Sequence, residues 1–334
     1  MKHSHFIERK KCPVCDSRDH RKIYECRYDE PPIRDYLVDF YVPQGTIEPE
    51  YLADASYVLC ECDKCHAIFQ RYIPGETLME RIYEHWIDPQ KARVDDHEGG
   101  DLQRFAKYAQ EIMQIVAFLG KTPSSLDLFD YGMGWGRWAL MAKAFGCNSY
   151  GTELSDTRVA FARSNGIRCL TWNEIALHKF DFINTEQVFE HIPNPLATLR
   201  YLSGALKPGG IIKISVPPAH DIERRLKSMD WQSPKGSRNS LNAVAPLEHI
   251  NCFRRTSIAT MANEAGMQEV HIPMTLCWAY STAWRDARQI AKNVVLPVYR
   301  DVLKRQNYVL LTNKQTQEGG VDSTRSRGAG IPKS

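Results

Sequence analysis

Four cysteines near the N-terminus stand in two pairs whose spacing is typical of a metal site. Cys12 and Cys15 enclose two residues, and so do Cys62 and Cys65. Each such turn places two thiolates on one side, so two turns facing each other form the tetrahedral shell of a structural zinc ion. The spacing therefore predicts one zinc ion held by these four thiolates. Four other residues could each replace one ligand, although they are better interpreted as free side chains that bind no metal: Cys26, Cys60, His3 and His5.

A glycine-rich turn follows a short apolar segment in the middle of the chain. After Asp130 it carries three glycines at alternate positions, Gly132, Gly134 and Gly136. Glycine lets a ligand approach the backbone closely, and a turn between a strand and its helix is where parallel α/β sheets bind cofactors. The dinucleotide fingerprint has its third glycine one position later, where this chain has Arg137. The turn therefore indicates a cofactor without the pyrophosphate of a dinucleotide.

One acid follows this turn at a spacing that suits a ribose. Glu153 ends the next strand-like segment, about 20 residues after the first glycine. Its two carboxylate oxygens could accept hydrogen bonds from both ribose hydroxyls. An ordinary tight turn with a helix-capping acid would explain the same residues, but the order of strand, glycines, helix and acid favours ribose binding.

Alternating strands and helices must position these residues. From residue 125 onward, short apolar runs alternate with helical segments, separated by turn residues. The predicted strands are 126–129, 149–153, 167–170, 180–184, 211–216, 268–271 and 308–312. This alternation is typical of an α/β fold, here a Rossmann-like, doubly wound, mostly parallel sheet behind a small N-terminal zinc ribbon.

The chain divides into four parts. Residues 1–75 are predicted to form the zinc-binding ribbon, 76–124 connecting helices, and 125–314 the cofactor-binding domain. Residues 315–334 contain almost no apolar side chains and are predicted to be a disordered tail. Within the large domain, the polar stretch 221–246 has the composition of a functional loop or lid.

Five segments in order resemble the successive motifs of class I S-adenosylmethionine-dependent methyltransferases. They are 130–136, 151–155, 180–183, 190–193 and 206–210. The resemblance implies that residues 125–314 bind S-adenosylmethionine. The paired cysteines ahead of such a domain resemble the zinc ribbon of bacterial methyltransferases that act on sugars or secondary metabolites.

This resemblance implies a role for each matching residue. Asp130, Gly132 and Gly134 would face the methionine part of the cofactor, Gly136 belongs to the same turn, and Glu153 would hold the ribose. The remaining positions lie at the two ends of the cofactor: Trp172 and Asn173 beside adenine, and Thr185, Glu186 and Gln187 at the reacting end.

Two histidines are candidates for the base that takes a proton from the methyl acceptor. His249 resembles the histidine of a His-x-Asn-x-Phe segment in many small-molecule members of the class, and His191 follows the fourth predicted strand. Imidazole is the usual general base near neutral pH. A histidine that only ties down a loop is an equally good interpretation of His249 and a better one of His191. Ubiquinone-pathway O-methyltransferases carry an acid where this chain has Gln187, which argues against a catalytic divalent metal.

Composition narrows the choice of acceptor. The chain has 43 basic and 40 acidic residues, a net charge of +3, so no strong field attracts nucleic acid. The charge therefore argues against a nucleic-acid acceptor. The resemblance of the zinc ribbon and of the segment around His249, together with the polar stretch 221–246, implies a small polar acceptor, a sugar or sugar-derived intermediate, methylated on oxygen or carbon. An RNA methyltransferase that uses the zinc ribbon to recognise RNA, or a non-catalytic cofactor-binding scaffold, are the alternatives.

The sequence also bears on location. It contains no apolar run of membrane-spanning length, and its first residues are charged rather than signal-like. We expect a cytoplasmic protein that makes no membrane contact, in a reducing compartment where paired cysteines bind metal rather than form disulfides. The oligomeric state is not predicted.

Overall fold

The computed structural model describes residues 5–87, 102–282, 287–303 and 307–314. The predicted disordered tail at 315–334 lies outside the described residues. Among the helices of the described ranges, none combines the length and the apolar character needed to cross a membrane.

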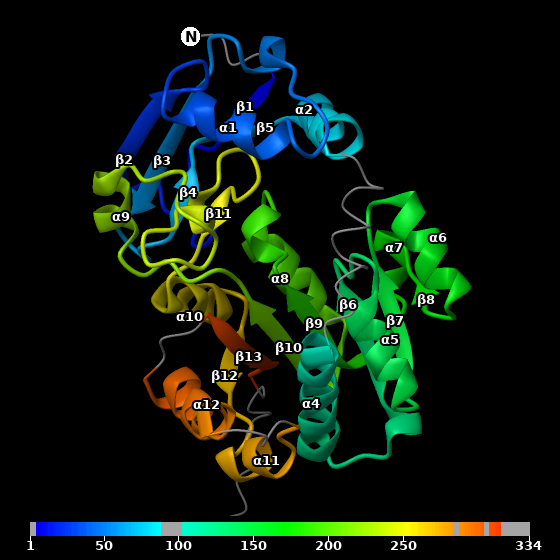
Figure 1. Ribbon diagram of the computed structural model, residues 1–334. Coiled ribbons are helices and arrows are strands. Elements are labelled where there is room, and N and C mark those ends of the chain that lie inside the picture. The colour runs from blue at the N-terminus through cyan, green and yellow to red at the C-terminus, as the bar shows by residue number, and fades with distance from the viewer. Residues whose placement is uncertain (1–4, 88–101, 283–286, 304–306, 315–334) are drawn as a thin grey trace, which may run out of the picture.

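A seven-stranded sheet forms the centre of the larger part (Figure 1), in the order β12-β13-β10-β9-β6-β7-β8. The strands are β6 (Asp127–Tyr131), β7 (Asn148–Thr152), β8 (Arg168–Cys169), β9 (Phe180–Glu186), β10 (Leu206–Ser215), β12 (Met267–Val270) and β13 (Tyr308–Asn313). The pairings from β10 to β8 are parallel, whereas β13 is antiparallel to both of its neighbours. The predicted doubly wound, mostly parallel sheet is confirmed.

Helices cover both faces of this sheet, as its continuous apolar strands require. On one face Phe129 stacks on Phe180, in a cluster shared with α8 (Pro195–Gly204) and α10 (Arg255–Glu264). On the other face Phe182 stacks on Trp138 of α5 (Arg137–Ala144), beside α4 (Leu102–Leu119). The remaining helices of the larger part are α6 (Asp156–Ser164), α7 (Trp172–Ile175), α11 (Met274–Ala279) and α12 (Ala287–Pro297).

The N-terminal part is built on a smaller antiparallel sheet in the order β11-β4-β3-β2. Its strands are β2 (His20–Arg27), β3 (Ser56–Cys62), β4 (Ile68–Gln70) and β11 (Asn251–Cys252). A second ladder pairs β1 (Phe6–Glu8) with β5 (Tyr72–Pro74), while α1 (Ile33–Tyr41) and α2 (Glu76–Arg81) complete the module. Because β11 comes from far along the chain, the ribbon is completed by the larger domain.

The predicted lid is anchored on this N-terminal module. It includes α9 (Ile222–Ser228), whose Glu223 pairs with Arg21 of β2. Trp231 is only 4% exposed and lies among the aromatic rings of Tyr24, Tyr36 and Tyr57. The buried apolar side chains of this segment therefore hold it against the N-terminal module.

Candidate active site

The glycine turn lies at the carboxyl end of β6, where the sheet order reverses direction. Gly132, Gly134 and Gly136 all have left-handed backbone angles, with φ of 72°, 55° and 71°. A side-chain carbon at Gly132 would come within 2.7 Å of Val188, whereas one at Gly134 would meet nothing within 4 Å. Gly134 therefore borders open space, so its backbone can be approached by a ligand.

Glu153 follows β7 and is bound to this turn. Its Oε2 accepts a hydrogen bond of 2.9 Å from the Gly134 amide, and its Oε1 accepts one of 2.9 Å from the Leu154 amide. Arg158 lies 3.8 Å from the same Oε1. The Ser155 amide also donates to Oε1, at 3.3 Å. A carboxylate has about four acceptor positions, so these three hydrogen bonds leave room for one further donor. Holding two ribose hydroxyls would require Glu153 to release the Gly134 amide.

Asp130 lies beneath the turn rather than on its open side. It is 3% exposed, and its Oδ1 accepts a hydrogen bond of 2.7 Å from Asn184 on β9. Burial raises the pKa of Asp130 to about 7. The contact fastens the ends of β6 and β9 together, and these are the strands that carry the turn and the predicted reacting end.

Aromatic rings surround the predicted adenine position. Trp172 is 46% exposed and stacks on Tyr201 of α8, with ring centroids 4.3 Å apart. Tyr131, at the end of β6, lies 6.0 Å from the same indole ring. Asn173 is exposed beside it. The sequence analysis missed Tyr201 and Tyr131, which reach this place from two distant elements.

Three residues were expected at the reacting end of the cofactor, and their side chains have different surroundings. Thr185 is fully buried, and its hydroxyl donates a hydrogen bond to the Lys213 carbonyl of the neighbouring strand β10. Its hydroxyl proton is therefore used within the sheet. Glu186 is paired with Lys213 at 3.1 Å and with Lys107 at 3.0 Å. Burial alone would raise the pKa of Glu186, but these two ammonium groups lower it to about 2. Gln187 adopts a left-handed φ of 56°, unusual for a residue with a side chain.

Glu186 belongs to a buried network of charged side chains that includes Lys213 and Glu111. Lys213 is 1% exposed, and its Nζ lies 3.0 Å from a carboxylate oxygen of Glu111 on α4. Glu111 also accepts 2.8 Å hydrogen bonds from the Trp138 indole and the Tyr308 hydroxyl. Sequence reasoning missed this network. The only indication in the sequence was a charged residue within each of two apolar segments, Glu111 in 102–119 and Lys213 in 211–216.

His191 and His249 lie side by side, with ring centroids 4.8 Å apart. His191 Nδ1 is 3.0 Å from the Glu248 carbonyl, and His249 Nδ1 is hydrogen-bonded to the Asn242 carbonyl. Burial lowers the pKa of His191 to about 4 and that of His249 to about 3. Both rings are therefore neutral near pH 7.

The turn that carries His191 is held by Asn251. The Asn251 side-chain amide donates to the Phe189 and Ile192 carbonyls, at 3.0 and 2.7 Å. The guanidinium of Arg9, from the N-terminal module, donates to Asn251 Oδ1 at 2.7 Å. The asparagine of the His-x-Asn-x-Phe segment thus fixes the two histidine-bearing segments relative to one another.

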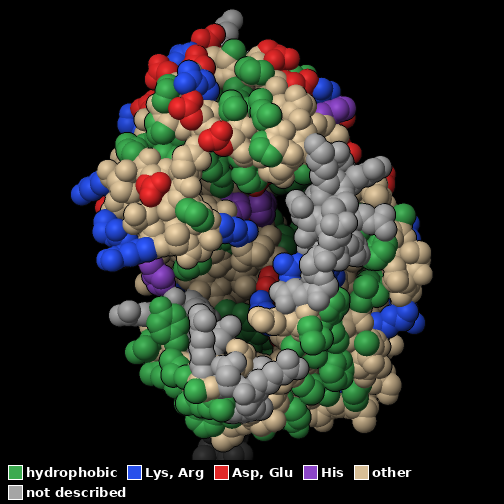
Figure 2. Space-filling view, viewed as in Figure 1, with side chains coloured by type: hydrophobic (Ala, Val, Ile, Leu, Met, Phe, Trp, Pro, Cys, Tyr) green, Lys and Arg blue, Asp and Glu red, His purple; other side chains and the backbone are tan. Residues whose placement is uncertain are grey.

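The N-terminal module reaches the same region. The Tyr41 hydroxyl lies 3.4 Å from Glu248 Oε1, and burial raises the pKa of Glu248 to about 7. Tyr83, which follows α2, is close enough to Glu248 and Glu153 that burial and these charges raise its pKa. Figure 2 shows this face of the molecule hollowed at its centre, with histidine side chains at the edge of the hollow.

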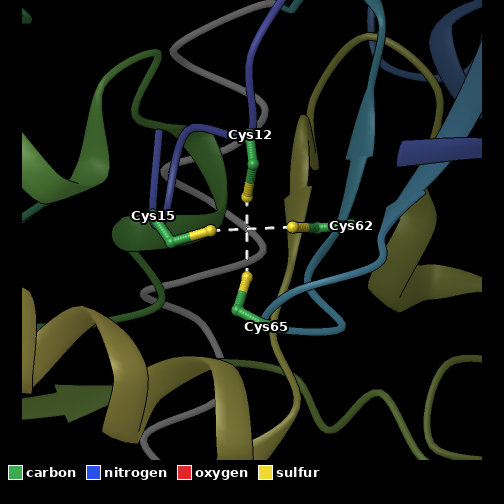
Figure 3. Close-up of side chains that lie close together, drawn as sticks. All are labelled: Cys12, Cys15, Cys62 and Cys65. Atoms are coloured by element: carbon green, nitrogen blue, oxygen red, sulfur yellow. Dashed lines mark hydrogen bonds between the residues drawn. The ribbon is translucent and has the colours of Figure 1, made fainter. Parts of the chain in front are cut away.

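The four predicted zinc ligands converge on one point, as Figure 3 shows. The sulfur of Cys12 lies 3.6 Å from that of Cys65, and Cys15 lies 3.6 Å from Cys62. Thiolates bound tetrahedrally to zinc at about 2.3 Å lie about 3.8 Å apart, so the donor set fits the ion. The other candidates near the N-terminus are elsewhere: Cys26 faces the Glu30 carbonyl, Cys60 lies apart on β3, His5 packs against Tyr51, and His3 is outside the described residues.

Both cysteine turns have the same backbone geometry. The residue after each second cysteine, Asp16 or His66, has a left-handed φ, 57° or 59°. Its amide donates to the carbonyl of the first cysteine, Cys12 or Cys62, at 3.0 or 2.9 Å. This repetition shows that each turn presents its two sulfurs in the same way.

Comparison with known proteins identifies a family. A family model described as a methyltransferase domain matches residues 102–272, half of the chain. No curated protein sequence matches.

Several solved structures share a distant likeness. The plantazolicin methyltransferase BpumL in complex with SAH is 14% identical over 68% of this chain and 91% of its own, with a TM-score of 0.43. PKMT2 from Rickettsia typhi in complex with AdoHcy is 16% identical over 63% of this chain and 53% of its own, with a TM-score of 0.40. CalS10, an amino pentose methyltransferase from Micromonospora echinaspora, is 19% identical over 38% of this chain and 56% of its own, with a TM-score of 0.32.

Proposed function

Since the chain belongs to the methyltransferase-domain family and is thus an S-adenosylmethionine-dependent methyltransferase, we propose that its acceptor is a small polar metabolite. The proposed acceptor is a sugar or a sugar-derived intermediate, methylated on oxygen or carbon. The observation that carries this proposal is the pair of buried, neutral imidazoles of His191 and His249 beside the carboxyl edge of the sheet.

The proposed cofactor position follows the carboxyl ends of β6 and β7. The open side of Gly134 and the carboxylate of Glu153 would hold the methionine and ribose parts, and the Trp172 ring offers a surface for adenine. S-adenosylmethionine supplies an activated methyl group on a sulfonium. The protein therefore has to position the acceptor in line with that group, and little covalent chemistry is needed.

The proposed transfer needs a site for one proton. As the acceptor oxygen or carbon forms its bond to the methyl group, the carbon–sulfur bond breaks and its electron pair stays on sulfur. The proton of the acceptor leaves at the histidine pair, where His249 is the leading candidate. Its Nδ1 must carry the hydrogen because its partner, the Asn242 carbonyl, can only accept. The Nε2 lone pair of His249 is then available to act on the acceptor.

The N-terminal module has two proposed roles. Four thiolates fill the coordination shell of a zinc ion completely, so Cys12, Cys15, Cys62 and Cys65 would hold a structural zinc. The second role is to cover the acceptor, because Tyr41 contacts Glu248 next to His249. This covering role favours a small acceptor over RNA, and so does the near-neutral charge of the chain.

A labelled-methyl assay tests the proposal. The protein and labelled S-adenosylmethionine are incubated with a metabolite extract and, separately, with total RNA. We expect label in the small-molecule fraction. Label that enters only RNA would overturn the acceptor class.

The histidine role is tested with the His249→Ala variant. We expect turnover to fall by about 100-fold or more, with cofactor affinity nearly unchanged, because general acid–base groups contribute about 100- to 10,000-fold. His271→Ala is the matched control, since this half-exposed histidine follows β12 at the far edge of the sheet. Equal turnover in the two variants would remove His249 from the mechanism.

A further inference from the structure

One carboxylate beside the histidine pair has no partner. Glu190 is 1% exposed, and among the described residues neither of its carboxylate oxygens has a hydrogen-bond partner. A buried polar group without a partner costs about 1–3 kcal/mol, and more when it is charged. Such a group calls for a bound ion, a bound water or a functional reason.

Two imidazole nitrogens lie next to this carboxylate. One ligand atom from each of Glu190, His191 and His249 lies within 4.8 Å of the other two. Ligands of a tetrahedral zinc ion at about 2.1 Å lie about 3.4 Å apart, so binding an ion would require the three side chains to move closer together by up to about 1.4 Å.

The hydrogen bonds of the two histidines suit metal binding. Each Nδ1 faces a backbone carbonyl, that of Glu248 for His191 and that of Asn242 for His249. A carbonyl only accepts, so each Nδ1 carries the hydrogen and each Nε2 keeps its lone pair. A metal-binding histidine typically donates its other N–H in this way, which fixes the orientation of the ring.

We propose that Glu190, His191 and His249 bind a divalent metal ion of the zinc, iron or manganese class. Two imidazoles and one carboxylate form a three-ligand set that leaves coordination positions open. The sequence argued against such an ion because position 187 carries Gln187 instead of an acid. In the structure the third ligand comes instead from His249, on a segment that Asn251 fastens to the first two.

The role of this ion in catalysis rests on the proposed function, and the ion would define the acceptor of that reaction more closely. The open positions would bind the acceptor hydroxyl together with a neighbouring oxygen, so the acceptor class becomes a vicinal diol or a hydroxycarbonyl compound. A bound divalent ion lowers the pKa of a coordinated oxygen. With the ion bound, the hydroxyl proton would pass to solvent, because the Nε2 atom of His249 would be a ligand; without the ion, His249 stays the candidate base of the proposed function.

A cobalt titration of the full chain tests the site. Dialysis against EDTA should remove a labile ion and leave the four-thiolate zinc in place. We expect the dialysed protein to bind one further equivalent of Co²⁺, with a visible spectrum that lacks thiolate charge-transfer bands. Absence of this further equivalent in the wild-type protein would overturn the inference, whatever the variants do.

Two variants locate the ion. Glu190→Gln keeps the side-chain shape, and His249→Ala removes a ligand. We expect each to bind Co²⁺ more than about 100-fold more weakly, since loss of even a supporting contact costs 10- to 100-fold. His271→Ala is the control and should bind normally. Retained S-adenosylmethionine binding shows that a variant is folded, and unchanged Co²⁺ affinity in both folded variants would place the ion elsewhere.

Metal binding and methyl transfer can fail separately. If cobalt binds as expected but no small molecule is methylated, the proposed function fails and the metal site stands. If EDTA leaves methyl transfer intact and no cobalt binds, the function stands and the metal site is refuted.

Discussion

Removal of the Glu111 carboxylate should strongly destabilise the protein. In the Glu111→Leu variant the buried ammonium of Lys213 loses its ion pair with Glu111 and keeps the one with Glu186. The Trp138 indole and the Tyr308 hydroxyl lose the same acceptor.

The size of this effect follows from burial. Breaking a buried ion pair by removing one partner costs about 3–5 kcal/mol, because the other charge stays buried. Glu186 still neutralises part of the Lys213 charge, which moves the ion-pair part toward the lower limit. Each neutral donor that is left unpaired adds about 1 kcal/mol or more. We therefore expect a loss of about 3–5 kcal/mol in the free energy of unfolding.

Chemical denaturation, followed by intrinsic fluorescence and by circular dichroism, measures this loss. Glu50→Gln is the control, because Glu50 is exposed, and it should change stability by less than about 0.5 kcal/mol. The double variant Glu111→Leu/Lys213→Met removes both charges and should recover part of the loss. A loss below about 1 kcal/mol in Glu111→Leu, or additive losses in the double variant, would refute the reasoning.

Three further predictions concern the cofactor, the zinc and the pH dependence. We expect micromolar binding of S-adenosylmethionine, about −8 kcal/mol, and Gly134→Val should weaken it by at least about 100-fold in calorimetry. Gly120→Val is the control, since Gly120 also has a left-handed φ and open space around it. Equal affinity in the two variants would contradict the assignment of the cofactor site. Cys65→Ser should lose the zinc that survives EDTA dialysis, measured by elemental analysis, whereas Cys26→Ser should keep it; full zinc in Cys65→Ser would place the ion elsewhere. The Glu186 pKa of about 2 lies below its unfolded value, so the stability contributed by Glu186 is present above about pH 4.3 and lost as pH falls through about 2. The free energy of unfolding, measured by denaturation at each pH, should therefore fall more steeply with decreasing pH for the wild type than for Glu186→Gln. Equal pH dependence in the two proteins would show that the fold does not stabilise the ionised carboxylate.

Several features could be predicted from the sequence because they depend on short stretches of chain. The alternation of apolar runs and helices predicted each strand of the large sheet to within a few residues, with β10 longer than expected. The glycine turn and the cysteine turns needed only the spacing of a few neighbours. Such local patterns are set by backbone sterics and by the period of the apolar side chains.

Other features were decided only by tertiary structure. Long-range pairing places β13 antiparallel within the large sheet and gives β11 to the N-terminal sheet. The contacts of a side chain near a strand end depend on which strand pairs beside it. Thr185 and Glu186 are neighbours in β9, yet Thr185 is bonded to the Lys213 carbonyl of β10, whereas Glu186 pairs with two ammonium groups.

The candidate site itself combines both kinds of information. The sequence by itself determined that a glycine turn, an acid and two histidines accompany a parallel sheet. Only the folded chain brings His249 to Glu190 and His191, and Glu111 to Lys213, because these side chains come from segments far apart in the sequence. Their pKa values and their capacity to bind an ion arise from burial and from that proximity, and neither is encoded in any short stretch of residues.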